Sequence, residues 1–440
     1  MGQAKSVGLP AGRAGKRLHA VLFLFLLLAA LTPSLAPAAE ISLSSRTYLL
    51  YFERDVTGGS TQRFAPVYEY LSADARGLGD TPVSFHFYGW GRQDLQDATG
   101  SGKTSGDLGS AYLQYIHPVG NAEARLGRFF LAEGGAQETV DGVFLKARTG
   151  YGPGMSVFGG VPVERSITST GTGDSIFGGR IFYARPGIAE IGLSYLLESG
   201  EFQGDDRKEV AGDLWLRPPG FVELIGRASY NEATGALSSQ RYVVRLMPLA
   251  AVDLALGFET YTYRDRFQAA LNPAFLSPAI DNGDKVRIVS AVLDWKAVEN
   301  LTLEAVVKNY RHSASDPGDA NRLEAGVRYA YNDRKDTGGL SAALVTADRD
   351  ENAYQEYRGF ATCSPGKWRF ALDALAHRYK QAINGTNRAY HVVGSAGYRL
   401  LDMLQLSGDL TYTQSPGFDK DYAGLVRASL LFETSTGGGK

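Results

Sequence analysis

The sequence predicts an all-β fold, a single transmembrane antiparallel β-barrel of about 22 strands (about 18–22), with short periplasmic turns and longer extracellular loops. Three observations carry this prediction. Apolar and polar residues alternate along one segment after another, and the connections between these segments alternate between short and long. After residue 39, no apolar run is long enough to form a membrane-spanning helix.

The first 38 residues have the pattern of a secretory signal peptide. Four Lys or Arg residues between positions 5 and 17 precede the uncharged apolar run 20–31, and the small residues Ala36, Pro37 and Ala38 follow it. A membrane anchor is the alternative, but such a run rises only about 18 Å against roughly 30 Å of hydrocarbon. We therefore predict export with cleavage near Ala38, so that residues 1–38 are the signal peptide and residues 39–440 the barrel.

The segment 323–331 shows the alternation clearly. Apolar side chains occupy its odd-numbered positions, while Glu324, Gly326 and Arg328 stand between them. A repeat of two residues places each set on its own face of a β-strand. Such segments run for about ten residues, the length of a tilted strand that crosses a bilayer. The same alternation recurs in 252–259, 301–308, 368–377 and 404–412.

The connections supply a separate test, because membrane barrels have short turns at one end and longer loops at the other. Counted from Ser42, brief links follow the even-numbered strands and longer polar segments follow the odd-numbered ones, with few exceptions. The brief links are 119–121, 150–152, 186–187, 218–220, 248–249, 298–299, 365–366 and 401–402. The longer segments are 94–104, 165–173, 200–207, 264–283, 313–320 and 381–387. A soluble β-sandwich has no reason to follow this order.

Composition excludes several classes of function. The chain has 440 residues and a formal net charge of −2, which gives no electrostatic reason to expect a nucleic-acid partner. A single cysteine, Cys363, excludes a disulfide framework, and the histidines lack metal-ligand spacing. We expect no cofactor and no metal site.

A barrel of about 16 or more strands encloses water, so its inward-facing charges would line a pore. Rings of cationic side chains favour anions, and a slight basic surplus here predicts weak anion preference. The alternative is that each charge is merely a solvated wall residue or half of a cross-strand pair, such as Glu324 with Arg328. The predicted lining comprises Lys146, Arg148, Arg180, Arg227, Arg241, Arg245, Lys308, Arg328, Arg369, Arg399, Arg427, Glu304, Glu324, Asp373 and Asp409.

The longest connection, 264–283, is unusually apolar for an exposed loop, since it contains Phe267, Leu271 and Phe275. If it folds inward it narrows the pore, with Arg266 and Asp281 as constriction residues. If it does not, it is an external lid over the neighbouring loops. The sequence leaves both open.

Two segments resemble those of known channels. The final strand candidate, Tyr422 to Phe432, alternates and ends in an aromatic residue, like the last strand of Gram-negative outer-membrane porins, although residues 433–440 follow it here. The run 125–130, Arg-Leu-Gly-Arg-Phe-Phe, followed by Asp-Gly-Val at 141–143, resembles the "LGR…DG" strand pair of porins and porin-like channels. The resemblance spans the barrel sequence and implies an outer-membrane channel for passive diffusion of small hydrophilic solutes.

The plug-free single barrel also resembles the porin-like channels that accompany cytochrome conduits in metal-reducing bacteria, some of which are associated with selenite uptake. This resemblance implies oxyanions such as selenite among the solutes. The partners it implies are outer-membrane lipid and lipopolysaccharide, small ions or solutes, and periplasmic or outer-membrane lipoproteins or cytochromes.

Two rival functions stay open at this point. The barrel would otherwise be a scaffold that sheathes a multihaem cytochrome, or a hydrolase with a site such as Ser395 near His391. Two residues four apart on one strand lie about 13 Å apart, too far for a direct hydrogen bond. We expect a channel and not an enzyme.

Overall fold

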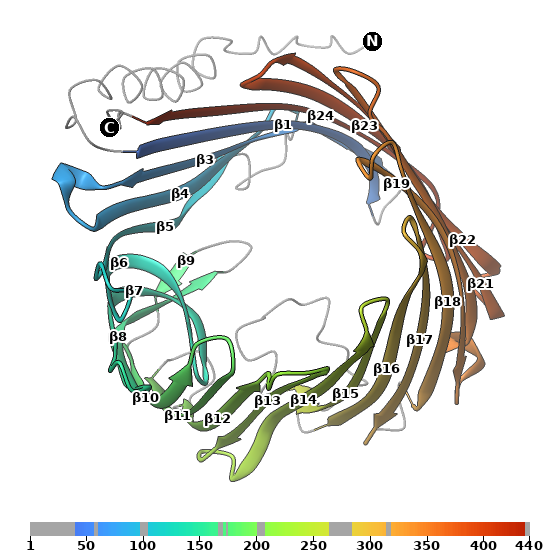
Figure 1. Ribbon diagram of the computed structural model, residues 1–440. Coiled ribbons are helices and arrows are strands. Elements are labelled where there is room, and N and C mark those ends of the chain that lie inside the picture. Colours follow the sequence, from blue (N-terminus) through green and yellow to red (C-terminus); the bar gives the residue numbers. More distant parts are fainter. Residues whose placement is uncertain are drawn as a thin grey trace, which may run out of the picture.

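The chain forms one closed antiparallel β-barrel (Figure 1). The computed structural model describes residues 40–56, 60–96, 104–165, 170–172, 175–199, 207–263, 284–313 and 318–435. β2 and β3 both pair with β1, and β9 and β10 both pair with β8, so each couple occupies one place in the wall. The wall therefore has 22 strands, and the predicted fold class is confirmed.

The strands follow one another around the wall in chain order. The first half comprises β1 (Glu40–Val56), β2 (Ser60–Phe64), β3 (Pro66–Arg76), β4 (Val83–Asp94), β5 (Thr104–Ile116), β6 (Ala122–Glu133), β7 (Ala136–Arg148), β8 (Pro153–Arg165), β9 (Thr170–Thr172), β10 (Ser175–Arg185), β11 (Ala189–Ser199) and β12 (Arg207–Leu216). The second half comprises β13 (Val222–Asn231), β14 (Ala236–Leu249), β15 (Val252–Thr262), β16 (Lys285–Val298), β17 (Leu301–His312), β18 (Ala320–Tyr331), β19 (Asp336–Ala347), β20 (Tyr354–Cys363), β21 (Trp368–Ile383), β22 (Thr386–Leu401), β23 (Leu404–Ser415) and β24 (Phe418–Ser435). Two single-turn 3₁₀ segments, η2 (Leu78–Asp80) and η4 (Asp350–Asn352), lie in connections.

Two predicted long connections are wrong. The segment 381–387 is mostly strand, because β21 continues to Ile383 and β22 begins at Thr386. Asn384 and Gly385 form the turn between them with φ of 47° and 83°, the left-handed backbone that a two-residue hairpin requires. Part of the segment 165–173 is also strand, since β9 pairs with the end of β8. The predicted brief links fall within about two residues of the observed turns.

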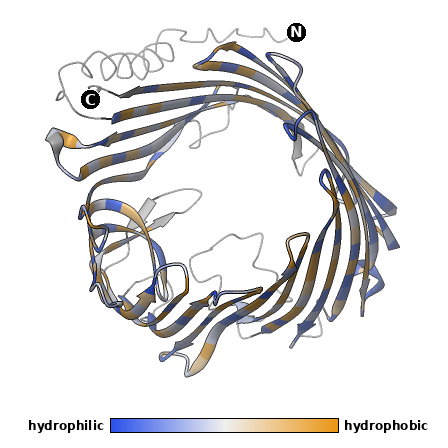
Figure 2. Cartoon of the chain, viewed as in Figure 1, coloured by the Kyte–Doolittle hydropathy of each residue, from blue (hydrophilic) through white to orange (hydrophobic). Residues whose placement is uncertain are grey.

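The two faces of the wall differ in polarity, and Figure 2 shows the resulting alternation of bands along the strands. On β10 and β11 the outer side chains Phe177, Ile181 and Leu193 are 55%, 64% and 53% exposed. Between them Arg180 and Ser194 point inward and pair in register. So much exposed apolar surface is unfavourable in water, and it is what a barrel presents to lipid. None of the helical segments in the described ranges is long and apolar enough to span a membrane.

The β6–β7 hairpin departs from this regular wall (Figure 1). β6 pairs with β5 only as far as Arg128, and beyond that residue the hairpin folds into the lumen. Gly127 and Gly142 stand opposite each other where the hairpin bends. Gly127 has φ of +123°, and a Cβ on Gly142 would lie 2.2 Å from the carbonyl oxygen of Gly159. Only glycine lets the three strands approach this closely.

The infolded hairpin packs on the inner side of the wall. Its side chains Phe129, Leu131 and Val140 are at most 1% exposed. They form an apolar cluster with Phe158 of β8 and Leu196 of β11. The barrel thus contains a core between two layers in this sector, whereas a plain barrel wall has none. The pattern of the sequence inverts accordingly. Leu126 and Val143, on one side of the two glycines, face outward, whereas Phe129 and Val140, on the side of the hairpin tip, face the wall.

The barrel closes where β1 meets β24. This seam pairs Glu40 with Ser435 at one end and Phe52 with Ala423 at the other, a run of 13 registered pairs. The two strands are the first and last in the chain, so closure depends on the longest separation in sequence that the fold contains. The predicted signal peptide, residues 1–38, lies outside the described residues.

Candidate functional site: the lumen and its infolded hairpin

The tip of the β6–β7 hairpin is hydrogen-bonded to the inner face of the wall at β11 and β13. The backbone N–H of Gly135 donates to the Ser194 hydroxyl at 2.8 Å, and Arg227 Nη2 donates to the Gly135 carbonyl oxygen at 2.8 Å. Gly134 has φ of +55°, and a Cβ there would lie 2.3 Å from Ser194 Oγ. Position 134 therefore requires glycine, since a side chain there would push the tip off β11.

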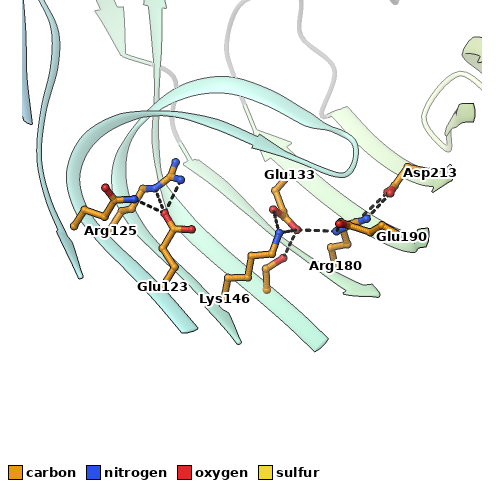
Figure 3. A network of polar contacts seen from close by, with 9 residues as sticks. Glu123, Arg125, Glu133, Lys146, Arg180, Glu190 and Asp213 are labelled. Atoms are coloured by element: carbon orange, nitrogen blue, oxygen red, sulfur yellow. Dashed lines mark hydrogen bonds and ion pairs between the residues drawn. The ribbon is translucent and has the colours of Figure 1, made fainter. Parts of the chain in front are cut away.

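Glu133 holds the same tip through charge (Figure 3). Its carboxylate accepts hydrogen bonds from Lys146 Nζ at 3.0 Å, Ser156 Oγ at 3.0 Å and Arg180 Nη1 at 3.2 Å. The side chains of Glu133 and Arg180 are 6% and 4% exposed. A buried carboxylate is tolerated only when it is paired and hydrogen-bonded, and this one has three donors.

Arg180 connects the hairpin to the next two strands (Figure 3). Its Nη1 donates to Glu190 Oε1 at 2.7 Å, and its Nε donates to Asp213 Oδ1 at 3.0 Å, with a second bond between Nη2 and the same carboxylate. The planar guanidinium suits such forked contacts. Three carboxylates surround Arg180 and compensate its positive charge. Its role is therefore structural, and it does not attract anions in the lumen.

A second tie lies farther along β7. Arg207 Nη1 of β12 donates to Glu138 at 3.0 Å, and Arg207 Nη2 donates to Glu209 at 2.7 Å. Arg207 Nη1 also lies 3.4 Å from Glu198 Oε2. The hairpin is thus fixed by three arginines that reach it from the wall, namely Arg180, Arg207 and Arg227. We infer that it is a rigid part of the lumen surface, since buried and satisfied networks of this kind specify one arrangement.

The "LGR…DG" residues act where the hairpin bends. Arg128 Nε and Nη2 donate to the two carboxylate oxygens of Asp141, each at 2.7 Å. Arg128 Nη1 donates to the Leu108 carbonyl oxygen at 3.0 Å and lies 3.7 Å from Asp107. This side chain therefore bridges β5 and β6 at the position where their backbone ladder ends.

A chain of polar side chains continues below the bend on the inner face. Arg125 and Gln114 both donate to Glu123 Oε1 at 2.6 Å (Figure 3). His86 links Gln114 at 3.1 Å to Asp74 at 2.5 Å. These contacts join β3 to β6 across four strands. They leave the wall polar but with its charges mutually satisfied.

The opposite half of the lumen is lined by simpler pairs. Arg328 pairs with Glu304 of the neighbouring strand, and their side chains are 47% and 36% exposed. The predicted pairing of Glu324 with Arg328 is not formed, because Arg322 takes Glu324 at 2.9 Å and Glu356 at 2.6 Å. These charges remain in contact with the lumen.

All fifteen predicted lining residues lie in strands, and by register they share the inner face with Arg180. Four acids have arginine partners within 4.0 Å: Glu304 with Arg328, Glu324 with Arg322, Asp373 with Arg358, and Asp409 with Arg427. Among the described residues, several of the bases form no ion pair. These bases are Arg148, Arg227, Arg241, Lys308, Arg369 and Arg399.

The predicted constriction residues Arg266 and Asp281 lie outside the described residues, together with the rest of loop 264–283. The element that narrows the lumen in the described part of the chain is the β6–β7 hairpin, which sequence reasoning missed. Its signal was present in the sequence: apolar Phe129, Leu131 and Val140 occupy positions where the preceding alternation places polar residues.

The candidate hydrolase residues are not brought together as a catalytic site. His391 Nδ1 bonds to Thr413 Oγ1 at 2.9 Å, and Ser395 lies four residues farther along the same strand. Cys363 is an exposed free thiol at the end of β20. Within the described ranges, no three His, Cys, Asp or Glu side chains converge as a metal site.

No family model and no curated protein sequence matches this chain. Solved structures resemble it distantly. The translocation pore of the P pilus usher PapC is 11% identical with a TM-score of 0.46, covering 89% of this chain and 99% of its own. Acinetobacter baumannii OccAB2 is 10% identical with a TM-score of 0.46, covering 91% and 100%. Pseudomonas aeruginosa OccK8 (OprE) is 12% identical with a TM-score of 0.44, covering 90% and 98%.

Proposed function

We propose that this protein is an outer-membrane porin through which small hydrophilic solutes diffuse passively. The observation that carries the proposal is a closed wall of 22 strands with an apolar outer face and a charged inner face. Strands spaced about 4.8 Å apart and tilted by about 40° close around a diameter of roughly 45 Å, which is far more than side chains fill. Such an interior holds water, and solutes cross with it.

The proposed channel prefers anions weakly. The four predicted acids are each within 4.0 Å of an arginine, while six of the predicted bases have no carboxylate partner in the described ranges. These bases favour anions, and acid-rich clusters such as Arg207 with Glu138, Glu198 and Glu209 offset part of their charge, so the preference is weak. The potential of these bases would attract oxyanions such as selenite, as it would any small anion.

The proposed location follows from the same features. A signal peptide over residues 1–38 would deliver the chain across the inner membrane, and the apolar outer face would place the barrel in the outer one. The partners would then be outer-membrane lipid and lipopolysaccharide. Membrane fractionation with N-terminal sequencing of the mature protein tests both parts. A mature chain that still begins at Met1, or one recovered from the soluble fraction, would overturn them.

Planar-bilayer recording of the purified barrel tests the proposed function. We expect stable single-channel conductance, and in a KCl gradient a reversal potential displaced modestly toward that of chloride. A barrel that inserts but carries no current contradicts the proposal. Haem that co-purifies with such a silent barrel would favour the cytochrome sheath in its place.

A further inference from the structure

Five aromatic side chains form a continuous patch on the inner face of β1, β3 and β4: Tyr48, Tyr68, Tyr70, Tyr88 and Trp90. Register assigns them to the lumen. Tyr48 stands opposite Arg427 of β24, which bonds to Ser407 on the inner face, and Tyr70 stands opposite Trp90. We call this group the aromatic patch.

Each ring of the aromatic patch packs beside at least one other ring. Tyr70 contacts Tyr48 edge to face at 5.4 Å, and it lies nearly parallel to Tyr68 at 6.3 Å and to Tyr88 at 6.5 Å. Trp90 adjoins Tyr68 at 6.5 Å. Tyr70 is therefore the centre of the patch.

Position makes the aromatic patch unusual. Aromatic residues of membrane barrels commonly stand on the outer face at the lipid interface, where both lipid and water satisfy them. These five face the lumen instead, and Tyr88 is 38% exposed. Apolar ring faces left in contact with water are a binding surface for another apolar or π face.

Arginines surround the aromatic patch. The guanidinium of Arg92 lies 5.7 Å from the Tyr68 ring centroid, and that of Arg427 lies 5.8 Å from the Tyr48 centroid. Arg46 is exposed and stands opposite Tyr70 in register, and within the described residues it forms no ion pair. A cation beside a ring face suits a ligand that carries both a ring and a negative charge.

The carboxylates at the edge of the aromatic patch are already engaged. Asp94 is fully buried and lies 3.5 Å from Arg92, and Asp107 lies 3.7 Å from Arg128. Asp409 lies 4.0 Å from Arg427. Arg92 Nε is buried with no hydrogen-bond partner in the described part of the chain. The charge offered to the lumen beside the rings is therefore positive.

We propose that the aromatic patch binds ring-bearing organic anions: the ring lies against Tyr70 and its neighbours, and the anionic group meets Arg46. This inference rests on the proposed channel function, since such solutes would reach the patch through the lumen. It names a class of solute that binds inside the channel and does not only diffuse through it.

Equilibrium binding to the detergent-solubilised barrel tests the aromatic patch without requiring conduction. Benzenesulfonate serves as the ring-bearing anion, with methanesulfonate and benzyltrimethylammonium as probes that lack the ring or reverse the charge. We expect benzenesulfonate to bind more tightly than either. Tyr70→Leu should weaken its binding roughly fivefold, about the value of one aromatic contact. Tyr70→Phe, which keeps the ring, should retain most of it.

Two matched variants separate the aromatic patch from the rest of the lumen. Tyr354→Leu removes another inner-face tyrosine, which contacts His377 at 5.1 Å on the far wall. Arg369→Gln removes an inner-face charge of β21 in the same way that Arg46→Gln removes one from β1. We expect only Tyr70→Leu and Arg46→Gln to weaken benzenesulfonate binding. Equal loss in all four, or equal affinity for the three probes, would overturn the proposal.

Bilayer recording then distinguishes the two proposals. If both hold, the wild-type barrel conducts, and benzenesulfonate binds it in detergent more tightly than the other two probes. Current together with equal affinity for the three probes overturns the aromatic patch and leaves the channel standing. Binding in detergent without any current overturns the channel and leaves the aromatic patch as a site of another kind.

Discussion

The barrel wall is built differently in two sectors (Figure 1). From β6 to β13 an infolded hairpin lies on the inner surface, and Glu133 and Arg180 between the layers are 6% and 4% exposed. From β15 to β24 the wall is a single sheet, where Arg328 and Glu304 are 47% and 36% exposed. The same residue types therefore do different work. Buried charges in the first sector hold the hairpin in place, whereas the charges in the second are open to the lumen.

The largest expected contrast comes from removing one arginine in each sector. Arg180→Met leaves the buried Glu133 with only Lys146 and Ser156, so the free energy of unfolding should fall by about 3–5 kcal/mol. Arg328→Met removes a half-exposed partner of Glu304 and should cost less than about 1 kcal/mol. Urea unfolding in liposomes, followed by tryptophan fluorescence, measures both. Equal costs would show that the hairpin's network is not buried in solution.

Glycine replacements give the next contrast. A Cβ in Gly142→Ala would lie 2.2 Å from the Gly159 carbonyl oxygen, so we expect a loss of about 1–3 kcal/mol in the free energy of unfolding. Gly394→Ala meets nothing within 4 Å and should stay within about 0.5 kcal/mol of wild type. The same unfolding assay applies. A neutral Gly142→Ala would mean that the hairpin bends elsewhere.

Loss of the tip contact should have a smaller effect. Ser194→Ala leaves the Gly135 N–H without its acceptor, which costs about 1–2 kcal/mol. Hydrogen exchange at the Gly135 amide should accelerate, while Ser395→Ala in the single-layered sector serves as the control. Unchanged protection of Gly135 in Ser194→Ala would show that the other contacts of the hairpin hold the tip without this hydrogen bond.

The smallest expected effect is on ion selectivity. Arg241→Gln combined with Lys308→Gln removes two bases that have no ion pair in the described ranges, so the anion-to-cation permeability ratio should fall by less than about twofold. Reversal potentials at low salt measure the change. In 1 M salt, where the Debye length is about 3 Å, the difference from wild type should disappear. A change that persists there would point to altered pore shape.

The single-layered sector could be predicted almost completely from sequence. Alternation along β18, β21 and β23 follows from one wet and one apolar face, and short turns give the strand order. The infolded sector could not be predicted this way. In its hairpin, apolar residues face the barrel wall and not the lipid. Phe129 and Leu131 stand where the alternation of β6 places polar residues, and they face a second layer of the same chain.

The ion-pair partners of individual side chains could not be predicted from the pattern of single strands either. Arg180 was predicted as a pore-lining cation, and its carboxylates come from β6, β11 and β12. Register between strands decides such contacts, and a single sequence states no register for strands this far apart. The aromatic patch has the same origin, since its rings become neighbours only when β1, β3 and β4 align.

The seam between β1 and β24 bears on how this barrel is made. Its 13 pairs join the two ends of the described chain, so every other strand can be laid down before they meet. Until then β1 and β24 are unpaired edge strands, and each can pair with another polypeptide. Both edges must therefore be protected during assembly. A short peptide with the sequence of β24 should block barrel closure by pairing with β1.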